Sequence, residues 1–222
     1  MVDQIYFIVN KEREPDRYAS VLNSINILSL QNCKFMAACW STDITPELRK
    51  ERAYSDRAMR LHGRPHQYGA PELSSGEISL FLNYLACLED IRANFTDGTF
   101  IIFESDALFT HDFNASLARV MEIAQGVNWG TINIGQGEGN VPPNVQPGLN
   151  LYRSWGNKCA EGIIWNYKSV CKFLDYCTVL DGPIDCKIDV FTQYDGGPPI
   201  YWAHPPLVMQ GSIHKVFKSH LR

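Results

Sequence analysis

The chain has 222 residues, of which 45% are hydrophobic, and a formal net charge of −4 at pH 7. This length and apolar content suit one well-buried domain over residues 1–222 and are short for two domains. The acidic balance argues against a nucleic-acid partner, because binding to phosphate backbones needs a basic surface. No apolar run approaches the roughly 18 residues of a membrane span, so we expect at most peripheral contact with a membrane.

The cysteines and the N-terminal residues favour a cytoplasmic location. The seven cysteines are scattered along the chain without a CxxC pair, a pattern typical of buried reduced thiols rather than of a zinc site. The first residues, MVDQIYFIVN, carry an acid near the start and begin a strand almost at once, unlike a secretory signal peptide. We therefore expect the protein in the cytoplasm.

Short apolar runs alternate along the chain with segments of helical periodicity. In chain order, these patterns predict a strand at 4–9, a helix from Pro15 to about Leu28, a strand at 34–40, a helix from Pro46 to about Arg60, a loop at 61–71, a helix from 75 to 91, a strand at 100–103, a helix at 113–124, strands at 130–134 and 159–165, a helix at 167–176 and a strand at 200–203. Strands that alternate with helices indicate an α/β fold with a mostly parallel sheet.

One helix has a clear start signal. Ser74 and Glu77 form the pattern of a capping box, in which each side chain accepts a hydrogen bond from the other residue's backbone N–H. Apolar residues then recur at helical spacing from Ile78 to Ile91. We expect this helix to cover one face of the sheet, and the capping box explains Glu77 without a role in catalysis.

An acidic pair follows the predicted central strand. The stretch TFIIFESDALF, residues 99–109, leads a buried strand into Glu104 and Asp106. Carboxylates in such a place are costly unless a positive group meets them, and ligands of open α/β sheets bind at the carboxyl ends of strands. Hard oxygen ligands suit Mg²⁺ or Mn²⁺ held together with substrate phosphates. The alternative is a solvated turn after the strand.

A charged segment follows the first predicted strand. Arg13, Asp16 and Arg17 lie there, where a nucleotide would cross the edge of the sheet. An arginine offers a planar fork to phosphate or a flat face to a nucleobase. The alternative is an ordinary charged start of a helix.

Five segments, taken in order, resemble the family-25 glycosyltransferases, and together they run from residue 5 to about residue 215. They are IYFIVNKEREPDR, LSSGEISLFLNYLACLEDI, FESDALFTHDF, GPIDCKIDVF and PPLVMQGSIHK. Each segment alone is weakly specific, whereas the ordered set is more so. Members of this family build bacterial lipooligosaccharide and galactosylate procollagen.

The resemblance implies a GT-A-type, Rossmann-like sheet flanked by helices and a metal-dependent, inverting transfer. The sugar, galactose or glucose, would pass from a UDP donor to a hydroxyl of a glycan or lipid-linked acceptor. The resemblance implies Asp106 as a ligand of Mn²⁺ or Mg²⁺. Glu104 would be a second ligand or the residue that holds the donor, and a cation there would neutralise the departing diphosphate.

The same resemblance suggests further roles near the end of the chain. Asp185 would be the general base or acceptor anchor, with Asp189 on the same face if a helix begins at Ile184; the alternative is an acid that favours a helix N-terminus. His214 would be a metal ligand, unless it is a surface or packing residue. Lys215 would grip the diphosphate of the donor.

The chain departs from the family pattern at two places. Asn83 and Tyr84 replace a Ser-His pair, which bears on the acceptor, and Ser105 replaces the middle acid of Glu-Asp-Asp, which bears on the metal site. Two other functions therefore stay open. One is a degenerate transferase that binds a nucleotide or glycan without turnover, and the other is a metal-dependent phosphoesterase.

Overall fold

The computed structural model of the protein describes residues 2–52, 73–135, 144–154, 159–193 and 197–219. Its strands are β1 (Gln4–Ile8), β2 (Cys33–Met36), β3 (Thr99–Glu104), β4 (Ala107–Phe109), β5 (Thr131–Asn133), β6 (Asn150–Arg153), β7 (Gly162–Asn166), β8 (Ile200–His204) and β9 (Val208–Gln210). Its helices are α1 (Pro15–Leu28), the short 3₁₀ helix η1 (Ser41–Asp43), α2 (Pro46–Arg52), α3 (Ser75–Asn94), α4 (Phe113–Ala124), α5 (Tyr167–Tyr176) and α6 (Ile184–Gln193).

The described strands form a seven-stranded sheet in the order β2-β1-β3-β7-β5-β8-β6, with β4 and β9 in a separate antiparallel pair. Strands β2, β1, β3, β5 and β8 run in one direction. Strand β7 runs the opposite way between β3 and β5, and β6 does so at the edge. The α/β prediction is confirmed, but the sheet is mixed where the alternating pattern predicted a mostly parallel one.

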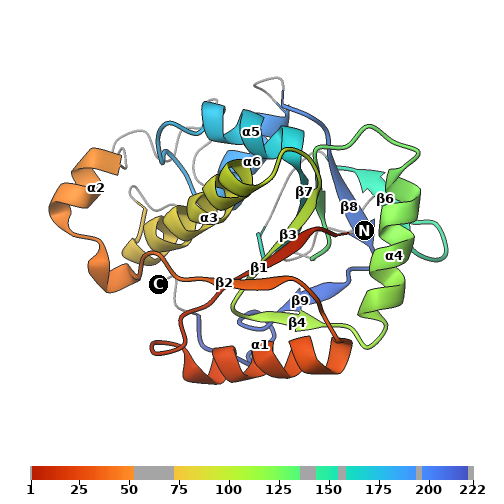
Figure 1. Cartoon of the computed structure of the whole chain (residues 1–222), viewed down its shortest axis with the longest axis horizontal. Helices are drawn as coiled ribbons and strands as arrows, with labels where there is room; N and C mark the ends of the chain where they lie inside the picture. Colours follow the sequence, from red (N-terminus) through yellow and green to blue (C-terminus); the bar gives the residue numbers. More distant parts are fainter. Residues whose placement is uncertain (1, 53–72, 136–143, 155–158, 194–196, 220–222) are drawn as a thin grey trace.

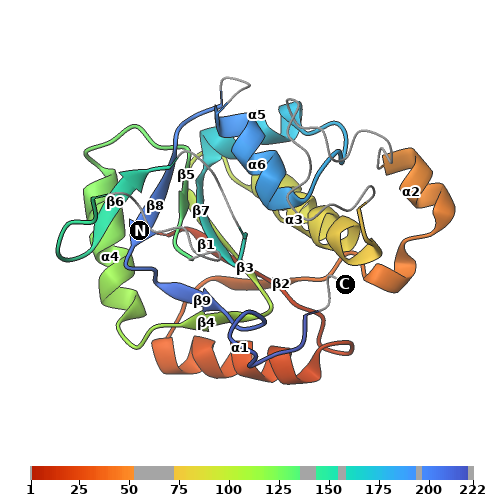
Figure 2. The same ribbon diagram turned by 180° about the vertical axis from the view of Figure 1, so that it is seen from behind.

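Helices cover both faces of this sheet (Figures 1 and 2). Alternate residues of β3 point to opposite faces: Phe100 and Ile102 join the core under α3, α5 and α6, whereas Ile101 and Phe103 join the core under α1, α4 and the β4–β9 pair. All four side chains are fully buried. Burial on both faces explains why the strand reads as one continuous apolar run.

Local sequence signals placed the helices well. Helices α4 and α5 match their predicted bounds, and α1 begins at Pro15. The capping box is confirmed, because Ser74 Oγ accepts a hydrogen bond from Glu77 N at 3.1 Å and Glu77 Oε2 accepts one from Ser74 N at 2.7 Å. Helix α2 is described only to Arg52, so the rest of the predicted helix and the predicted loop at 61–71 lie outside the described residues.

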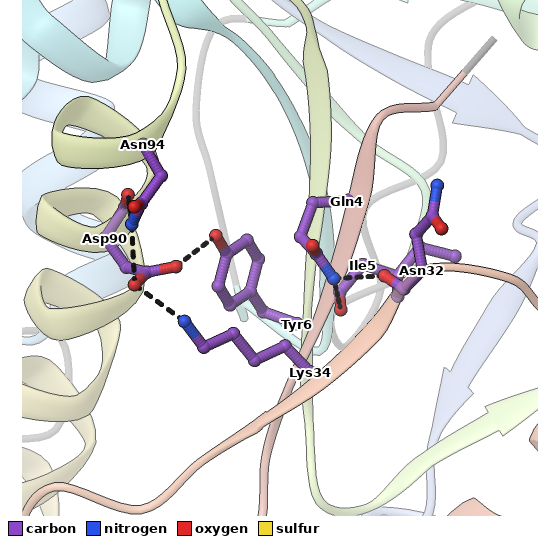
Figure 3. A network of polar contacts seen from close by, with 7 residues as sticks. All are labelled: Gln4, Ile5, Tyr6, Asn32, Lys34, Asp90 and Asn94. Carbon is purple, nitrogen blue, oxygen red and sulfur yellow. Dashed lines mark hydrogen bonds and ion pairs between the residues drawn. The ribbon is translucent and has the colours of Figure 1, made fainter.

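A polar network ties α3 to the edge of the sheet (Figure 3). Asp90 of α3 accepts hydrogen bonds from the Tyr6 hydroxyl of β1 and from Lys34 Nζ of β2, each at 2.7 Å. Asn94 Nδ2 also donates to Asp90 Oδ1 at 3.1 Å. Burial, together with the bond to Asp90, raises the pKa of Tyr6, so its hydroxyl stays protonated as a donor. The network holds α3 beside β1 and β2.

Strands β1 and β3 are parallel neighbours that end together. Their last residues, Ile8 and Glu104, are register partners. The carboxyl ends of these two neighbouring strands therefore lie side by side, and ligands of α/β folds bind at the carboxyl ends of strands. No helix in the described ranges is long and apolar enough to cross a membrane.

Candidate functional site

A pocket lies where β1 and β3 end. It holds about 560 Å³ of space, part of it open to solvent. Ile8 and Glu104 line it together with residues from α1, from the segment after β2, from the first half of α3, from the turn after β3 and from the chain at the end of β9. Segments far apart in sequence thus converge on the ends of two central strands.

The predicted acidic pair lines this pocket. Glu104 and Asp106 are both buried, with exposed fractions of 9% and 3%. Asp106 Oδ2 accepts a hydrogen bond from Ser212 N at 3.0 Å. Its Oδ1 is buried and has no hydrogen-bond partner among the described residues. Since a buried carboxylate oxygen without a donor costs free energy, Asp106 is poised for a positive or hydrogen-bonding ligand.

The carboxylates around Glu104 disfavour its charge. The pKa of Glu104 is raised well above its usual value, mainly by burial and then by the charges of Asp106, Glu161 and Asp185, whereas Arg17 acts in the opposite direction. Glu161 is fully buried. Several carboxylates thus act on Glu104, and Arg17 only partly offsets them. A bound cation would reduce this repulsion.

Replacing Glu104 with glutamine is expected to stabilise the ligand-free fold at neutral pH. A carboxyl with a raised folded-state pKa binds more protons when folded than when unfolded, so stability falls as the pH rises from the unfolded-state pKa towards the folded-state one. Glu104→Gln should remove that loss and raise the Tm by about 2–4 °C for each kcal/mol gained. Thermal unfolding with a chelator present, followed from about pH 4, near the ordinary pKa of glutamate, up to about pH 8, measures it. The same Tm difference between variant and parent at both ends of the range would contradict the prediction.

Ser105 takes part in a buried network with α1. Arg17 Nη1 donates to Ser105 Oγ at 2.7 Å, and the Ser105 hydroxyl donates to Glu14 Oε1 at 2.9 Å. Arg17 also pairs with Glu14, with Nη1 and Oε1 3.1 Å apart. An acid at position 105 would place another carboxylate beside Glu14. Ser105, where the family pattern has an acid, instead links Arg17 to Glu14 through its hydroxyl.

The chain after β9 is held by the same charged residues. Asp106 binds it through Ser212 N and, by its backbone oxygen, through Gly211 N at 2.8 Å. Arg17 donates to the backbone oxygen of Lys218 and lies 5.5 Å from the centre of the Phe217 ring. Arg17 and Asp106 thus form one wall of the pocket together with this segment.

The structure brings Asp185 near the acidic pair. Helix α6 begins at Ile184, so Asp185 and Asp189 lie on it four residues apart. Asp185 accepts hydrogen bonds from Cys159 N at 2.9 Å and from Cys186 N at 2.8 Å, and burial raises its pKa. Although neither aspartate lines the pocket, the charge of Asp185 acts on Glu104.

The other predicted site residues do not line the pocket. Arg13 and Asp16 are exposed at the start of α1, and His214 and Lys215 are exposed in the turns after β9. None of these four side chains lines the pocket, whereas Arg17 does. Their ligand roles stay predictions.

Several pocket residues were not predicted as site residues. Glu14 and Ser105 line the pocket and contact each other although they are about 90 positions apart in sequence. No local sequence pattern predicts such a contact. Trp40 follows β2 and was the last residue of the strand predicted at 34–40, so its position at the end of a predicted strand was an available signal. Asn83 was singled out only as a departure from the family pattern.

The oxygen atoms at the pocket suit a divalent cation that is held partly by the protein and partly by the phosphates of a bound substrate. Within the described residues, no group of three or more His, Cys, Asp or Glu side chains could hold a metal ion. Glu104 and Asp106 supply hard oxygens, and Asp106 Oδ1 is buried without a partner in the part of the chain that the structure describes. One or two carboxylates with substrate phosphates are a common environment for Mg²⁺.

Comparisons with known proteins give a distant relationship. No protein-family model matches the chain. The chain is 25% identical over 157 residues to the "Probable inactive glycosyltransferase 25 family member 3" of Rattus norvegicus, covering 67% of this chain and 26% of the rat protein. The mouse protein named "Inactive glycosyltransferase 25 family member 3" matches to the same extent. The chain thus spans about a quarter of the length of the curated relatives it matches.

Proposed function

We propose that this chain is a family-25, GT-A-type glycosyltransferase domain. It moves a sugar, galactose or glucose, with inversion from a UDP donor to a hydroxyl of a glycan or lipid-linked acceptor. The distant similarity to proteins named as glycosyltransferase family members supports the class of reaction. In the sheet, β7 is antiparallel to its neighbours β3 and β5, whereas the other inner strands run in one direction. This arrangement is compatible with a Rossmann-like fold.

One observation carries the proposal. Two buried carboxylates, Glu104 and Asp106, line a pocket at the ends of β1 and β3, and one oxygen of Asp106 is buried there without a hydrogen-bond partner among the described residues. A sugar nucleotide that arrives with a divalent cation supplies the positive charge that these carboxylates need. The same pocket contains Arg17, whose guanidinium suits a diphosphate.

The residues of the chain have distinct tasks in this proposal. Asp106 and Glu104 hold Mn²⁺ or Mg²⁺, which when bound neutralises charge on the leaving diphosphate. Arg17, fixed by Glu14 and Ser105, faces the donor from α1. Asp185 is the proposed base or anchor for the acceptor hydroxyl. It does not line the pocket in this structure, and its raised pKa favours proton uptake.

A donor screen tests the proposed function. Thermal unfolding is followed with UDP-galactose, UDP-glucose and GDP-sugars, each with and without Mn²⁺. A donor that binds only the folded state raises its stability by about 2.7 kcal/mol at a concentration of 100 Kd. We expect a rise in Tm with a UDP-sugar that depends on Mn²⁺. A response to GDP-sugars alone, or no response to any donor, would overturn the assignment.

A second candidate is a domain of the same origin that binds a donor without turnover. The names of both relatives describe them as inactive. The two functions predict the same donor binding but differ in product. Release of UDP with candidate acceptors over a long incubation supports the enzyme, whereas Mn²⁺-dependent UDP binding without release of UDP supports the binding domain.

A further inference from the structure

Trp40 lines the same pocket as Arg17 of α1. It follows β2 and is half-buried, and Glu104 and Asp106 line this pocket as well. A large aromatic side chain at this place offers a flat apolar surface to whatever the pocket holds.

Two buried polar residues of α3 hold the backbone that carries Trp40. Asn83 Nδ2 donates to the backbone oxygen of Cys39 at 2.7 Å, and Asn83 Oδ1 accepts from Cys39 N at 2.9 Å. Ser79 Oγ donates to the same Cys39 oxygen at 3.0 Å. Asn83 and Ser79 are 4% and 6% exposed. Buried polar groups in a helix need partners, and here the partner is the residue before Trp40.

The backbone of Trp40 itself is also fixed. Its N–H donates to Asp43 Oδ2 at 2.8 Å, and its backbone oxygen accepts from Asp43 N at 2.9 Å. All backbone hydrogen-bonding groups of Cys39 and Trp40 are therefore satisfied. An aromatic side chain held on such a rigid support is preorganised for a ligand, so little conformational entropy is lost on binding.

We infer that Trp40 is the platform on which the nucleobase of a nucleoside diphosphate stacks, and that Asn83 is the positioning residue that holds it there. The inference rests on the proposed function, since it assigns the part of the donor that Trp40 contacts. The pocket has both charged lining residues and an aromatic one, and this combination indicates the class of ligand. A nucleoside diphosphate has an anionic end for Arg17 and the cation site and a planar end for the indole, whereas a free sugar has no anionic end.

Calorimetric titration with Mn²⁺ present compares two probes, UDP and inorganic pyrophosphate. Trp40→Ala is expected to weaken UDP binding by roughly fivefold to a hundredfold, the usual effect of removing a base-stacking ring. Its affinity for pyrophosphate should change by less than about twofold. Trp40→Phe should keep most of the UDP affinity, and Asn83→Ala should weaken UDP binding with the same selectivity for UDP over pyrophosphate.

Tryptophan emission gives a second readout. The chain has five tryptophans, and under this inference UDP stacks on Trp40 alone. Trp40→Phe should therefore remove most of the quenching of tryptophan emission that UDP causes. Trp129→Phe is the matched control. Strand β5 runs in the same direction as β3, and Trp129 precedes the start of β5, whereas the pocket lies where β3 ends. This control should keep the quenching.

The outcomes separate the two proposals. If the parent protein binds UDP and Trp40→Ala binds it equally well, the platform is wrong and the proposed function stands. If Trp40→Ala loses UDP and pyrophosphate to the same degree, the platform is also wrong, because the effect is then not on the base. If the parent binds neither UDP nor any other nucleotide, both proposals fall.

Discussion

Replacing Asp106 with asparagine is expected to lower Mn²⁺-dependent donor binding and turnover by about a hundredfold or more. The change removes a negative charge from a pocket oxygen that has no partner among the described residues. The amide oxygen of the variant can still accept the bond from Ser212 N, which the parent makes at 3.0 Å, so the fold should persist. Calorimetric titration of UDP with and without Mn²⁺ measures the effect.

Asp175→Asn is the matched control for this experiment. Asp175 is an exposed aspartate of α5 that forms an ion pair with Arg92, and its side chain is 77% exposed. The control should bind UDP as the parent does. Equal affinity in the parent and in Asp106→Asn, with and without Mn²⁺, would show that Asp106 is no metal ligand.

Replacing Arg17 with methionine is expected to destabilise the fold by about 3–5 kcal/mol, because it leaves a buried charge without its partner. Glu14 and Arg17 have side chains that are only 5% and 9% exposed. The variant also removes the donor to Ser105 Oγ and the contact with the chain after β9. Urea denaturation measures the loss, and donor binding should weaken as well.

Two variants test the cause of that loss. Adding Glu14→Gln to Arg17→Met should recover part of the stability, since the buried charge that lost its partner is then removed as well, but should not recover donor binding. Arg119→Met is the matched control, because Arg119 and Glu122 form an ion pair with the same three-residue spacing on the surface, with side chains 56% and 66% exposed. Exposed pairs contribute about 0–1 kcal/mol. A comparable loss in the control would contradict an origin in burial.

Local sequence signals predicted most of the helices and the inner strands. Helix α3 begins where Ser74 and Glu77 predict, and α4 and α5 have their predicted bounds. Such signals work because a cap or an apolar period acts within a few residues. Strands β4, β6 and β9 were not predicted, since each is three or four residues long and is defined by its pairing with a distant segment.

The direction of β7 shows the same limit at the level of the sheet. An apolar run predicts a strand but says nothing of the strand that it will pair with. Strand β7 inserts between β3 and β5 in antiparallel register, and this choice depends on how the whole chain packs. The prediction of a mostly parallel sheet was therefore only partly right.

The sequence by itself determined that a buried strand ends in Glu104 and Asp106 and that an arginine, Arg17, follows the first strand. Only the tertiary structure decided which groups meet them. It brought Glu14 to Ser105 and Arg17, placed Asp185 near Glu104, and left His214 and Lys215 exposed. The reason is physical: the energy of a buried charge depends on every group around it, and those groups come from segments that only folding brings together.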